Sequence, residues 1–410
     1  MESNHPTAGL PRPAGFEDRM GHQTLAAPRG RLETAGMTAP PDAGTPLDIL
    51  VRRDDHATVE FADAPAADEI ELAPGQALLG IDAFALTSNN ITYATLGDFM
   101  SYWKFFPAPD GWGRIPVWGF ADVIRSACDG VTPGDRVYGF LPMSTHLVVQ
   151  PARVGETGFS DAAPHRAELH PVYNHYLRTA SDPGYDAGHE GEIMLLRPLF
   201  TTSFLIDDFL DDNARFGATG VVISSASSKT AYGTAFVISR RGDVETIGLT
   251  SAGNVDFVAR LGCYDHVLAY DEIATLPVDA PLAYVDLSGD AEVRGALHRH
   301  LGDALVYDCA VGMTHHDAMG ADPDLPGPAP VMFFAPAQIK KRAGELGPGG
   351  LQARVAEAWE QFLGLVTDPD RRLLTVERGA GAVAVKTAYL DALHGRVAPD
   401  VGTVLSLRVG

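Results

Sequence analysis

The chain has 410 residues, enough for two or three domains of ordinary size, and its hydrophobic fraction of 45% is sufficient to build a buried core. Its 31 basic and 53 acidic residues give a net charge of −22, which repels nucleic acids and anionic lipids and argues against both as partners. No long uncharged apolar run is present, so the sequence predicts no membrane span.

The three cysteines, Cys128, Cys263 and Cys309, lie far apart and form no CxxC pair. Neither a disulfide framework nor a thiolate zinc site is indicated, and a reducing cytoplasm is the expected location. Residues 1–45 are rich in Pro, Gly, Ala and Thr and contain no apolar stretch of signal-peptide length, so they are predicted to form a disordered tail.

Short strand-like segments separated by turn residues fill residues 47–153. The longest expected strand is 77–86, and "GVTPGD" at 130–135 places Pro and Gly where a tight turn needs them. The pattern predicts an all-β block, a partly open barrel. Residues 154–192, rich in Pro, Gly, His and Tyr, are expected to be an irregular loop that is either functional or disordered.

From residue 193 the pattern changes to short apolar strands that alternate with helices. "GVVISS", "ETIGLTS", "HVLAY", "LAYVDLSG", "ALVYDCAVG" and "PVMFFAP" are the expected strands. This alternation predicts an α/β fold with a doubly wound parallel sheet. The last segment, 373–409, is expected to form a strand, a helix and a strand.

Three stretches carry a family resemblance: "LLGIDAFALTSNN", "DVIRSACDGVTPGDRVYGF" and "DALHGRVAPDVGTVLSL". In this order and spacing they resemble the medium-chain dehydrogenase/reductase superfamily, and within it the zinc-independent quinone and enoyl reductases. The resemblance implies a GroES-like β-barrel domain at 46–192 and 367–410 and a Rossmann-type nucleotide-binding domain at 193–366. It also implies a homodimer that pairs through the edges of the nucleotide-domain sheets and acts on a small molecule.

The zinc branch of this superfamily places a cysteine and a histidine in the active site. Here Thr87 stands at the cysteine position and Trp118 at about the histidine position, and neither side chain can ligate zinc. The sequence therefore predicts no metal.

The turn after the strand at 220–224 is the candidate cofactor site. Such a turn binds a pyrophosphate because free backbone N–H groups and the positive end of a helix point at it. Glycines normally allow the close approach, whereas this turn has Ser225, Ser227, Ser228, Lys229 and Thr230. The residues remain small, and their hydroxyl groups can bind phosphate oxygens.

Lys229 and the end of the next strand indicate which nucleotide binds. A cation at a helix N-terminus costs roughly 0.3–1 kcal/mol unless an anion neutralises it, so Lys229 suggests a nearby phosphate; the alternative is a solvated lysine. Thr250, Ser251 and Asn254 follow the next strand without the acid that usually holds the ribose of NAD, which favours NADP(H). Ser251 or Asn254 could instead cap the following helix.

Other cofactor contacts are expected where the remaining strands end. Gly312 and Thr314 lie in "GMTH", directly after an expected strand, where the family's loops face the nicotinamide. Thr202, with Thr201 beside it, falls where the resemblance places a threonine near the nicotinamide ring. Packing within the helix is the alternative reading of both threonines.

Tyr173 and Tyr176 of "YNHY" are the candidate proton or hydrogen-bond donors. Both lie in the unusual insertion, which could fold over the site, and a phenol is neutral at pH 7. Aromatic packing that fixes a long loop is the alternative. Asn90, with Tyr93 and Trp103, comes from the first active-site loop and could line the pocket.

The leading interpretation is therefore an NADP(H)-dependent oxidoreductase that reduces an activated C=C or C=O of a small to medium, fairly apolar carbonyl compound. Two alternatives remain. One is a lyase or isomerase on the same fold that uses NADP without net redox change. The other is a non-catalytic protein with a decayed nucleotide site.

Overall fold

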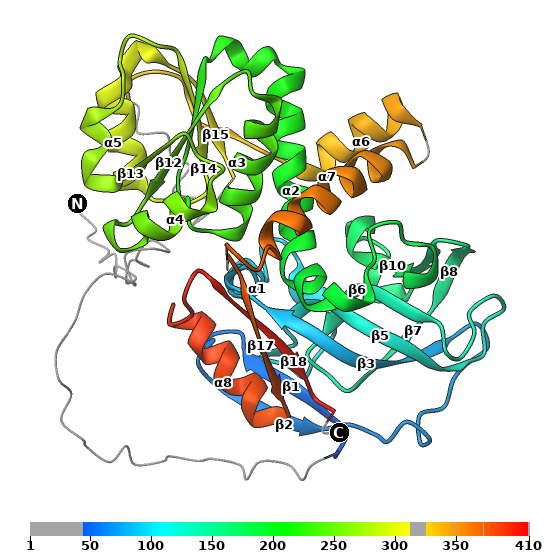
Figure 1. The fold of residues 1–410 in the computed structure, drawn as a ribbon. Coiled ribbons are helices and arrows are strands. Elements are labelled where there is room, and N and C mark those ends of the chain that lie inside the picture. The colour runs from blue at the N-terminus through cyan, green and yellow to red at the C-terminus, as the bar shows by residue number, and fades with distance from the viewer. Residues whose placement is uncertain (1–43, 312–324, 348, 372, 409–410) are drawn as a thin grey trace, which may run out of the picture.

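The computed structural model describes residues 44–311, 325–347, 349–371 and 373–408, so nearly all of the expected tail at 1–45 lies outside it. Within these residues, no helix is both long enough and apolar enough to cross a membrane. The two largest sheets of the described residues lie one above the other in Figure 1. The helices are α1 (Ser88–Thr95), α2 (Glu190–Asp212), α3 (Lys229–Arg241), α4 (Val255–Leu261), α5 (Ala291–Leu301), α6 (Ala335–Leu346), α7 (Gly350–Val366) and α8 (Ala382–Leu393).

The first sheet is a largely antiparallel, barrel-like structure. Its order is β17-β18-β3-β5-β6-β10-β9-β8, with β7 also paired to β3, and β2-β1-β4 forms a small sheet beside it. The strands are β1 (Leu47–Arg52), β2 (Val59–Asp63), β3 (Ala77–Leu86), β4 (Trp112–Gly113), β5 (Pro116–Ser126), β6 (Arg136–Pro142), β7 (His146–Val149), β8 (Pro151–Gly155), β9 (Gly158–Asp161), β10 (His175–Arg178), β17 (Thr375–Ala380) and β18 (Val401–Ser406). The expected strand–helix–strand at the C-terminal end is present as β17, α8 and β18.

The stretch 154–192 is more regular than the sequence suggested. It contributes β9 and β10 to the barrel sheet, where β10 pairs with β6 on one side and β9 on the other. Short 3-10 turns, among them η4 (Pro171–Asn174), connect these strands. The pairing was not foreseen because each strand has only four residues, too few to show an alternating pattern.

The second sheet has the order expected of a doubly wound fold. Its parallel strands run β13-β12-β11-β14-β15-β16, the two-halved order of a dinucleotide-binding domain. They are β11 (Gly220–Ile223), β12 (Glu245–Thr250), β13 (His266–Ala269), β14 (Leu282–Asp286), β15 (Leu305–Ala310) and β16 (Val331–Met332). Val221 and Ile223 pack on the face covered by α2 and α3, whereas Val222 packs on the opposite face with α5.

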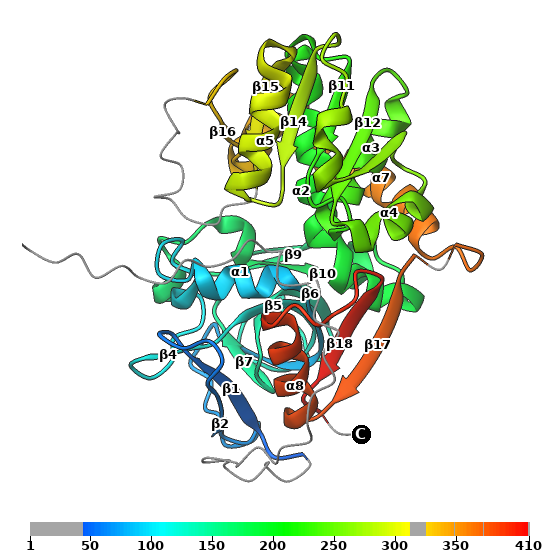
Figure 2. The same cartoon turned by 90° about the vertical axis from the view of Figure 1, so that its left-hand side faces the viewer.

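Helix α2 runs from the barrel to the parallel sheet, and the α6–α7 pair projects beside it (Figure 1). Phe362 of α7 stacks on Phe200 of α2 at a ring distance of 4.6 Å and also contacts Phe236 of α3. Figure 2 shows α1 on the side of the barrel that faces the parallel sheet. Helix α6 was not among the elements expected from the sequence, which placed only the strand "PVMFFAP" in this region.

We expect Phe362→Ala to destabilise the protein by about 3–5 kcal/mol, because the ring is 1% exposed and its loss opens a cavity among three helices. Phe334→Ala is the control, since that ring is 48% exposed and its loss should change stability by less than about 0.5 kcal/mol. Urea unfolding of both variants measures the difference. Equal, small effects would contradict the packing described for α7.

Candidate functional site

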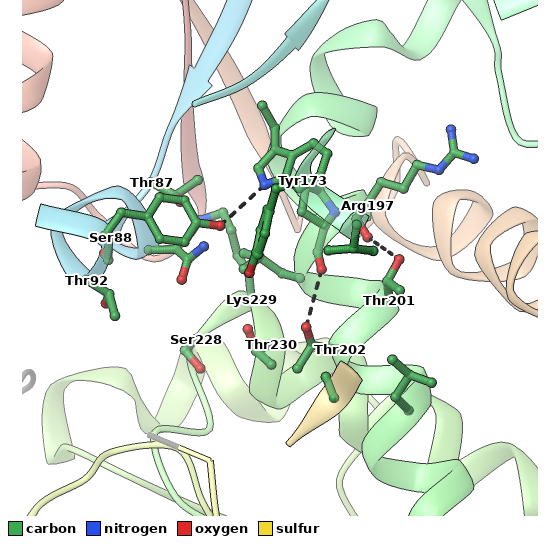
Figure 3. A pocket seen from close by; sticks show the side chains of 18 of the residues that line it. Thr87, Ser88, Thr92, Tyr173, Arg197, Thr201, Thr202, Ser228, Lys229 and Thr230 are labelled. Atoms are coloured by element: carbon green, nitrogen blue, oxygen red, sulfur yellow. Dashed lines mark hydrogen bonds between the residues drawn. The ribbon is translucent and has the colours of Figure 1, made fainter. Parts of the chain in front are cut away.

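A cavity of about 840 Å³ lies where the barrel, α2 and the carboxyl ends of the parallel strands meet. Its walls come from α1, η4, β10, α2, the α6–α7 pair and the segment before β18. They also include the turn at residues 225–230, which is called the serine turn below. In Figure 3, Thr87, Ser88 and Thr92 lie on one side, Ser228, Thr230 and Thr202 on another, and Tyr173 and Lys229 between them. The size suits a ligand of cofactor or drug dimensions.

The serine turn has the backbone geometry that glycine normally supplies. Ser225 has a φ of 53°, in the left-handed region that non-glycine residues rarely adopt. Its N–H donates to the Tyr270 hydroxyl at 3.0 Å, and its carbonyl accepts the Ser228 N–H at 2.8 Å. The Ala226 N–H is bound to the Leu249 carbonyl. These bonds hold the turn in a conformation that its serines would not select by themselves.

The first turn of α3 presents donors to the cavity. Ser228 is the N-cap residue, and its hydroxyl accepts the Ala231 N–H at 3.3 Å. In the described part of the chain, the N–H groups of Lys229 and Thr230 make no backbone hydrogen bond, as expected for the first residues of a helix. Ser225, Ser227, Ser228, Lys229 and Thr230 all line the cavity. The donor set therefore suits an anionic group such as a pyrophosphate.

Lys229 does not extend into solvent. Its Nζ donates to the carbonyl oxygens of Pro399 at 3.3 Å and Val401 at 3.1 Å. The residue as a whole is half-buried, but protein atoms enclose the ammonium group, and burial lowers the pKa of Lys229 to about 8, with Asp400 acting in the opposite direction. Among the residues described, no carboxylate forms an ion pair with it, so the amine lines the cavity without a negative partner.

The end of β12 lies apart from this amine. Thr250 is fully buried and its hydroxyl has no hydrogen-bond partner in the described structure. Asn254 does not cap α4 through its side chain; its amide donates to the Ser227 hydroxyl at 3.2 Å instead. Ser251 precedes the short turn that leads into α4. These three residues do not line the cavity, so the structure does not bring them together with the Lys229 amine.

A buried polar network behind the turn was not foreseen from the sequence. One oxygen of Asp286 accepts the hydroxyls of Ser224 and Ser288, both at 2.8 Å, and the Ser288 N–H at 3.1 Å. Its other oxygen pairs with Arg294 at 2.7 Å, and Arg294 also reaches Asp308. The network fixes the residue that begins the turn and the Ser288 loop, which lines the cavity.

Thr201 and Thr202 both line the cavity from α2, as Figure 3 shows. Their hydroxyls also donate along the helix, Thr201 to the Arg197 carbonyl at 2.9 Å and Thr202 to the Pro198 carbonyl at 3.5 Å. Pro198 cannot donate a backbone N–H to the helix, and the threonines sit in the turn that follows it. The positions of Thr201 and Thr202 thus fit both interpretations, packing within the helix and contact with a ligand in the cavity.

Tyr173 places its phenol at the cavity. Its hydroxyl lies 3.3 Å from that of Tyr102, and both residues line the cavity. Burial raises the pKa of Tyr102 to about 12 and that of Tyr173 well above its usual value of 10.0, so both phenols keep their protons at neutral pH. Trp118 and Tyr93 also line the cavity, and the Trp118 indole N–H donates to the Tyr93 hydroxyl at 3.3 Å.

Tyr176 has a different position from the one we expected. Its ring is fully buried in the barrel, stacked on Phe159, and its hydroxyl donates to the Phe140 carbonyl at 2.9 Å. It does not line the cavity. Alternate residues of a strand face opposite sides, so in β10 the neighbours His175 and Leu177 face the cavity instead. Tyr176 is therefore a structural residue.

Asn90 is also structural. Its side-chain oxygen accepts the Thr87 N–H at 2.7 Å, and its amide donates to the Pro116 carbonyl at 2.8 Å. Both bonds fix the start of α1, and Asn89 lines the cavity in its place. Of the other two residues of this segment, Tyr93 lines the cavity, whereas Trp103 packs in the barrel core.

The remaining expectations concern loops and metal. Gly312 and Thr314 lie outside the described residues. Thr87 and Trp118, at the positions of zinc ligands in the resembling superfamily, both line the cavity. Among the described residues there is no group of His, Cys, Asp and Glu side chains that could hold a metal ion.

Two parts of the wall had been given no role of their own from the sequence, although His175 belongs to the "YNHY" motif. His175 lines the cavity from β10, and burial lowers the pKa of this imidazole. The α6–α7 pair adds an apolar wall that includes Ile339, Leu351, Val355 and Trp359. The repeat of apolar residues in α7 was visible in the sequence, but it could not show which face meets a cavity rather than the core.

The comparisons with known proteins agree with this architecture. The model of the family described as "Protein of unknown function (DUF2855)" matches residues 84–398. The chain belongs to this family. No curated protein matches its sequence.

Solved structures show the same fold at low identity to this DUF2855 protein. CurA from Vibrio vulnificus in complex with NADPH has a TM-score of 0.57 at 12% identity, over 89% of this chain and 100% of that one. The CurF ER cyclopropanase from the curacin A biosynthetic pathway has 0.53 at 15%, over 88% and 99%. The mitochondrial 2-enoyl thioester reductase Etr1p/Etr2p heterodimer from Candida tropicalis has 0.52 at 14%, over 88% and 99%. The chain therefore shares its fold with these proteins.

We expect Tyr176→Phe to lower stability by about 1 kcal/mol, because it removes one buried hydrogen bond and leaves the ring in place. It should leave ligand binding at the cavity unchanged. Denaturant unfolding and a ligand titration measure the two effects. Weaker ligand binding at unchanged stability would contradict the structural role of Tyr176.

The buried amine predicts a specific pH dependence of stability. The pKa of Lys229 is about 8 in the folded protein against 10.5 for an ordinary lysine. Between these values the unfolded chain binds a proton that the folded chain does not, so the free energy of unfolding rises with pH, by on the order of 3 kcal/mol in total. In Lys229→Met this rise in the free energy of unfolding with pH should be absent, because methionine does not titrate. Urea unfolding of both proteins at several pH values tests it, and a difference that does not vary with pH would contradict it.

Proposed function

We propose that this protein is an NADP(H)-dependent reductase that acts on an activated C=C or C=O of a fairly apolar carbonyl compound. The observation that carries the proposal is the cavity itself. It joins an anion-binding turn at the end of a doubly wound sheet to a wall with two protonated phenols. A neighbour of the same fold was solved with NADPH, which supports the cofactor assignment.

The residues present fit such a cofactor. The left-handed Ser225 allows the turn to curve as a glycine turn does, and the N–H groups of Lys229 and Thr230 face an anion site. No carboxylate stands among residues 250–254, so a 2′-phosphate would meet no repulsion there. Because the Lys229 amine points toward Pro399 and Val401, we assign it to the pyrophosphate rather than to the 2′-phosphate, which revises the sequence-based interpretation.

When bound, the cofactor supplies a hydride to the substrate. The carbonyl oxygen of the substrate then gains negative charge, and a hydrogen bond from the Tyr173 phenol would stabilise it. Tyr102 holds that phenol in place through the 3.3 Å contact between their hydroxyls. Thr201 and Thr202 lie where they can orient the reacting groups, and the apolar wall of α7 excludes water from the substrate.

We expect purified protein to bind NADPH and to oxidise it in the presence of medium-chain enones or aldehydes. Fluorescence titration measures binding, and NADPH absorbance measures turnover across a panel of enones, quinones and aldehydes. Absence of binding to both NADPH and NADH would overturn the proposal and favour a non-catalytic role. Binding without consumption of NADPH by any compound of the panel would favour redox-neutral chemistry.

Tyr173→Phe should lower kcat/KM with an enone by about 10²-fold, because it removes the donor to the developing oxyanion. NADPH affinity should stay within about twofold of the wild type, since the phenol is not part of the turn. Tyr176→Phe is the matched control, from the same segment but facing the barrel core. Steady-state kinetics decide; equal kcat/KM for the two variants would remove Tyr173 from the reaction.

A further inference from the structure

Lys229 connects two parts of the protein that belong to different sheets. It is the first residue of α3, directly after the serine turn, and its Nζ donates to the carbonyls of Pro399 and Val401. Those residues lie in the segment 397–403, which comprises the loop before β18 and the first three residues of β18 and supplies part of the cavity wall. The lysine therefore spans the cavity from the turn to the opposite side.

The Lys229 ammonium has one N–H donor left for a third hydrogen-bond partner. An ammonium group has three N–H donors, and two of them are used on carbonyl oxygens. No carboxylate of the described residues pairs with the amine, although Asp400 lies in the same segment and favours its charged form at longer range. A charge enclosed by protein without a counterion is costly, and an anion on the turn would relieve that cost.

Residues 401–403 of this segment are held in the barrel sheet by pairing with β17, and Thr403 also pairs with Leu86 of β3, whereas the loop 397–400 has fewer backbone bonds. Its backbone bonds include Val401 N–H to the Ala398 carbonyl at 3.0 Å and Thr375 N–H to the Asp400 carbonyl at 2.7 Å. The first bond lies within the segment, and the second ties it to the start of β17. Within the described residues, the two bonds from the Lys229 ammonium therefore link the loop 397–400 and the start of β18 to the nucleotide side of the cavity.

We propose that Lys229 is a positioning residue that couples a phosphate group on the serine turn to the order of segment 397–403, and so assembles the substrate side of the cavity after the cofactor binds. The inference rests on the proposed function. A phosphate oxygen takes the remaining N–H in a charge-assisted bond, which is stronger than the neutral bonds of the free protein. The fixed ammonium then holds both carbonyls, and the wall becomes rigid before the substrate enters.

The chain offers a matched control. Lys386 of α8 also donates its Nζ to a backbone carbonyl, that of Val59 at 3.0 Å, but it does not line the cavity. Lys386→Met thus removes a comparable lysine–carbonyl bond without touching the turn. Lys229→Arg keeps the charge and the donors and serves as the conservative variant.

The test is hydrogen–deuterium exchange of the peptide that contains 397–403, with and without saturating NADPH or NADH. In the wild type and in Lys386→Met, either nucleotide should slow exchange about tenfold. In Lys229→Met the nucleotide should leave that exchange unchanged, and Lys229→Arg should restore part of the protection. Lys229→Met should also weaken NADPH and NADH alike, by roughly tenfold or more.

The outcomes separate this inference from the proposed function. Nucleotide binding that leaves the exchange of this segment unaltered in the wild type would overturn the coupling but not the function. Full nucleotide-dependent protection in Lys229→Met would likewise overturn the coupling and leave the proposed function standing. Failure of the wild type to bind either nucleotide would overturn both. A loss confined to NADPH, with NADH unaffected, would assign Lys229 to the 2′-phosphate and contradict the bridge.

Discussion

The site depends on one backbone constraint, the left-handed conformation of Ser225 at the end of β11. A chain that leaves a parallel strand and starts a helix over a phosphate has to turn back sharply, and glycine normally does so without strain. Here a serine adopts a φ of 53°, which costs a non-glycine residue on the order of 1 kcal/mol or more. Tyr270, Ser228 and Leu249 hold the turn by hydrogen bonds. The chain therefore makes this turn with a serine at a position where glycine is usual.

The same constraint explains the polar residues buried beneath the turn. Asp286 gathers Ser224, Ser288 and Arg294 around its two oxygens, so the ends of β11 and β14 are tied together below the cavity. A buried carboxylate is tolerated when it is paired and hydrogen-bonded. A turn without glycine needs support from its surroundings, and this network provides it from below while Tyr270 provides it from the side.

The sequence predicted those parts of the fold that local pattern determines. Apolar strands alternating with helices gave the parallel sheet, and the turn residues at 130–135 gave the β5–β6 connection. The sequence could not predict the elements that depend on pairing between distant segments. The four-residue strands β9 and β10 are recognisable only by their partners, and α6 follows an expected strand whose paired part is only Val331–Met332.

The candidate site shows the same limit at single-residue scale. Tyr173 and Tyr176 were equivalent in the sequence, but Tyr173 lies in the 3-10 turn η4 and Tyr176 in strand β10. The pleat of β10 sends His175 and Leu177 to the cavity and Tyr176 to the core. The type of residue at the turn was foreseen, whereas the direction of the Lys229 side chain was not, because its partners lie about 170 residues away.

The central claim is that the serine turn is the seat of a dinucleotide. A crystal structure grown with saturating NADPH tests it most directly. We expect the pyrophosphate oxygens to lie within hydrogen-bond distance of the Lys229 and Thr230 N–H groups and of the Lys229 ammonium. NADPH bound elsewhere, or a turn that stays closed against Pro399 and Val401 with no phosphate beside it, would contradict the account.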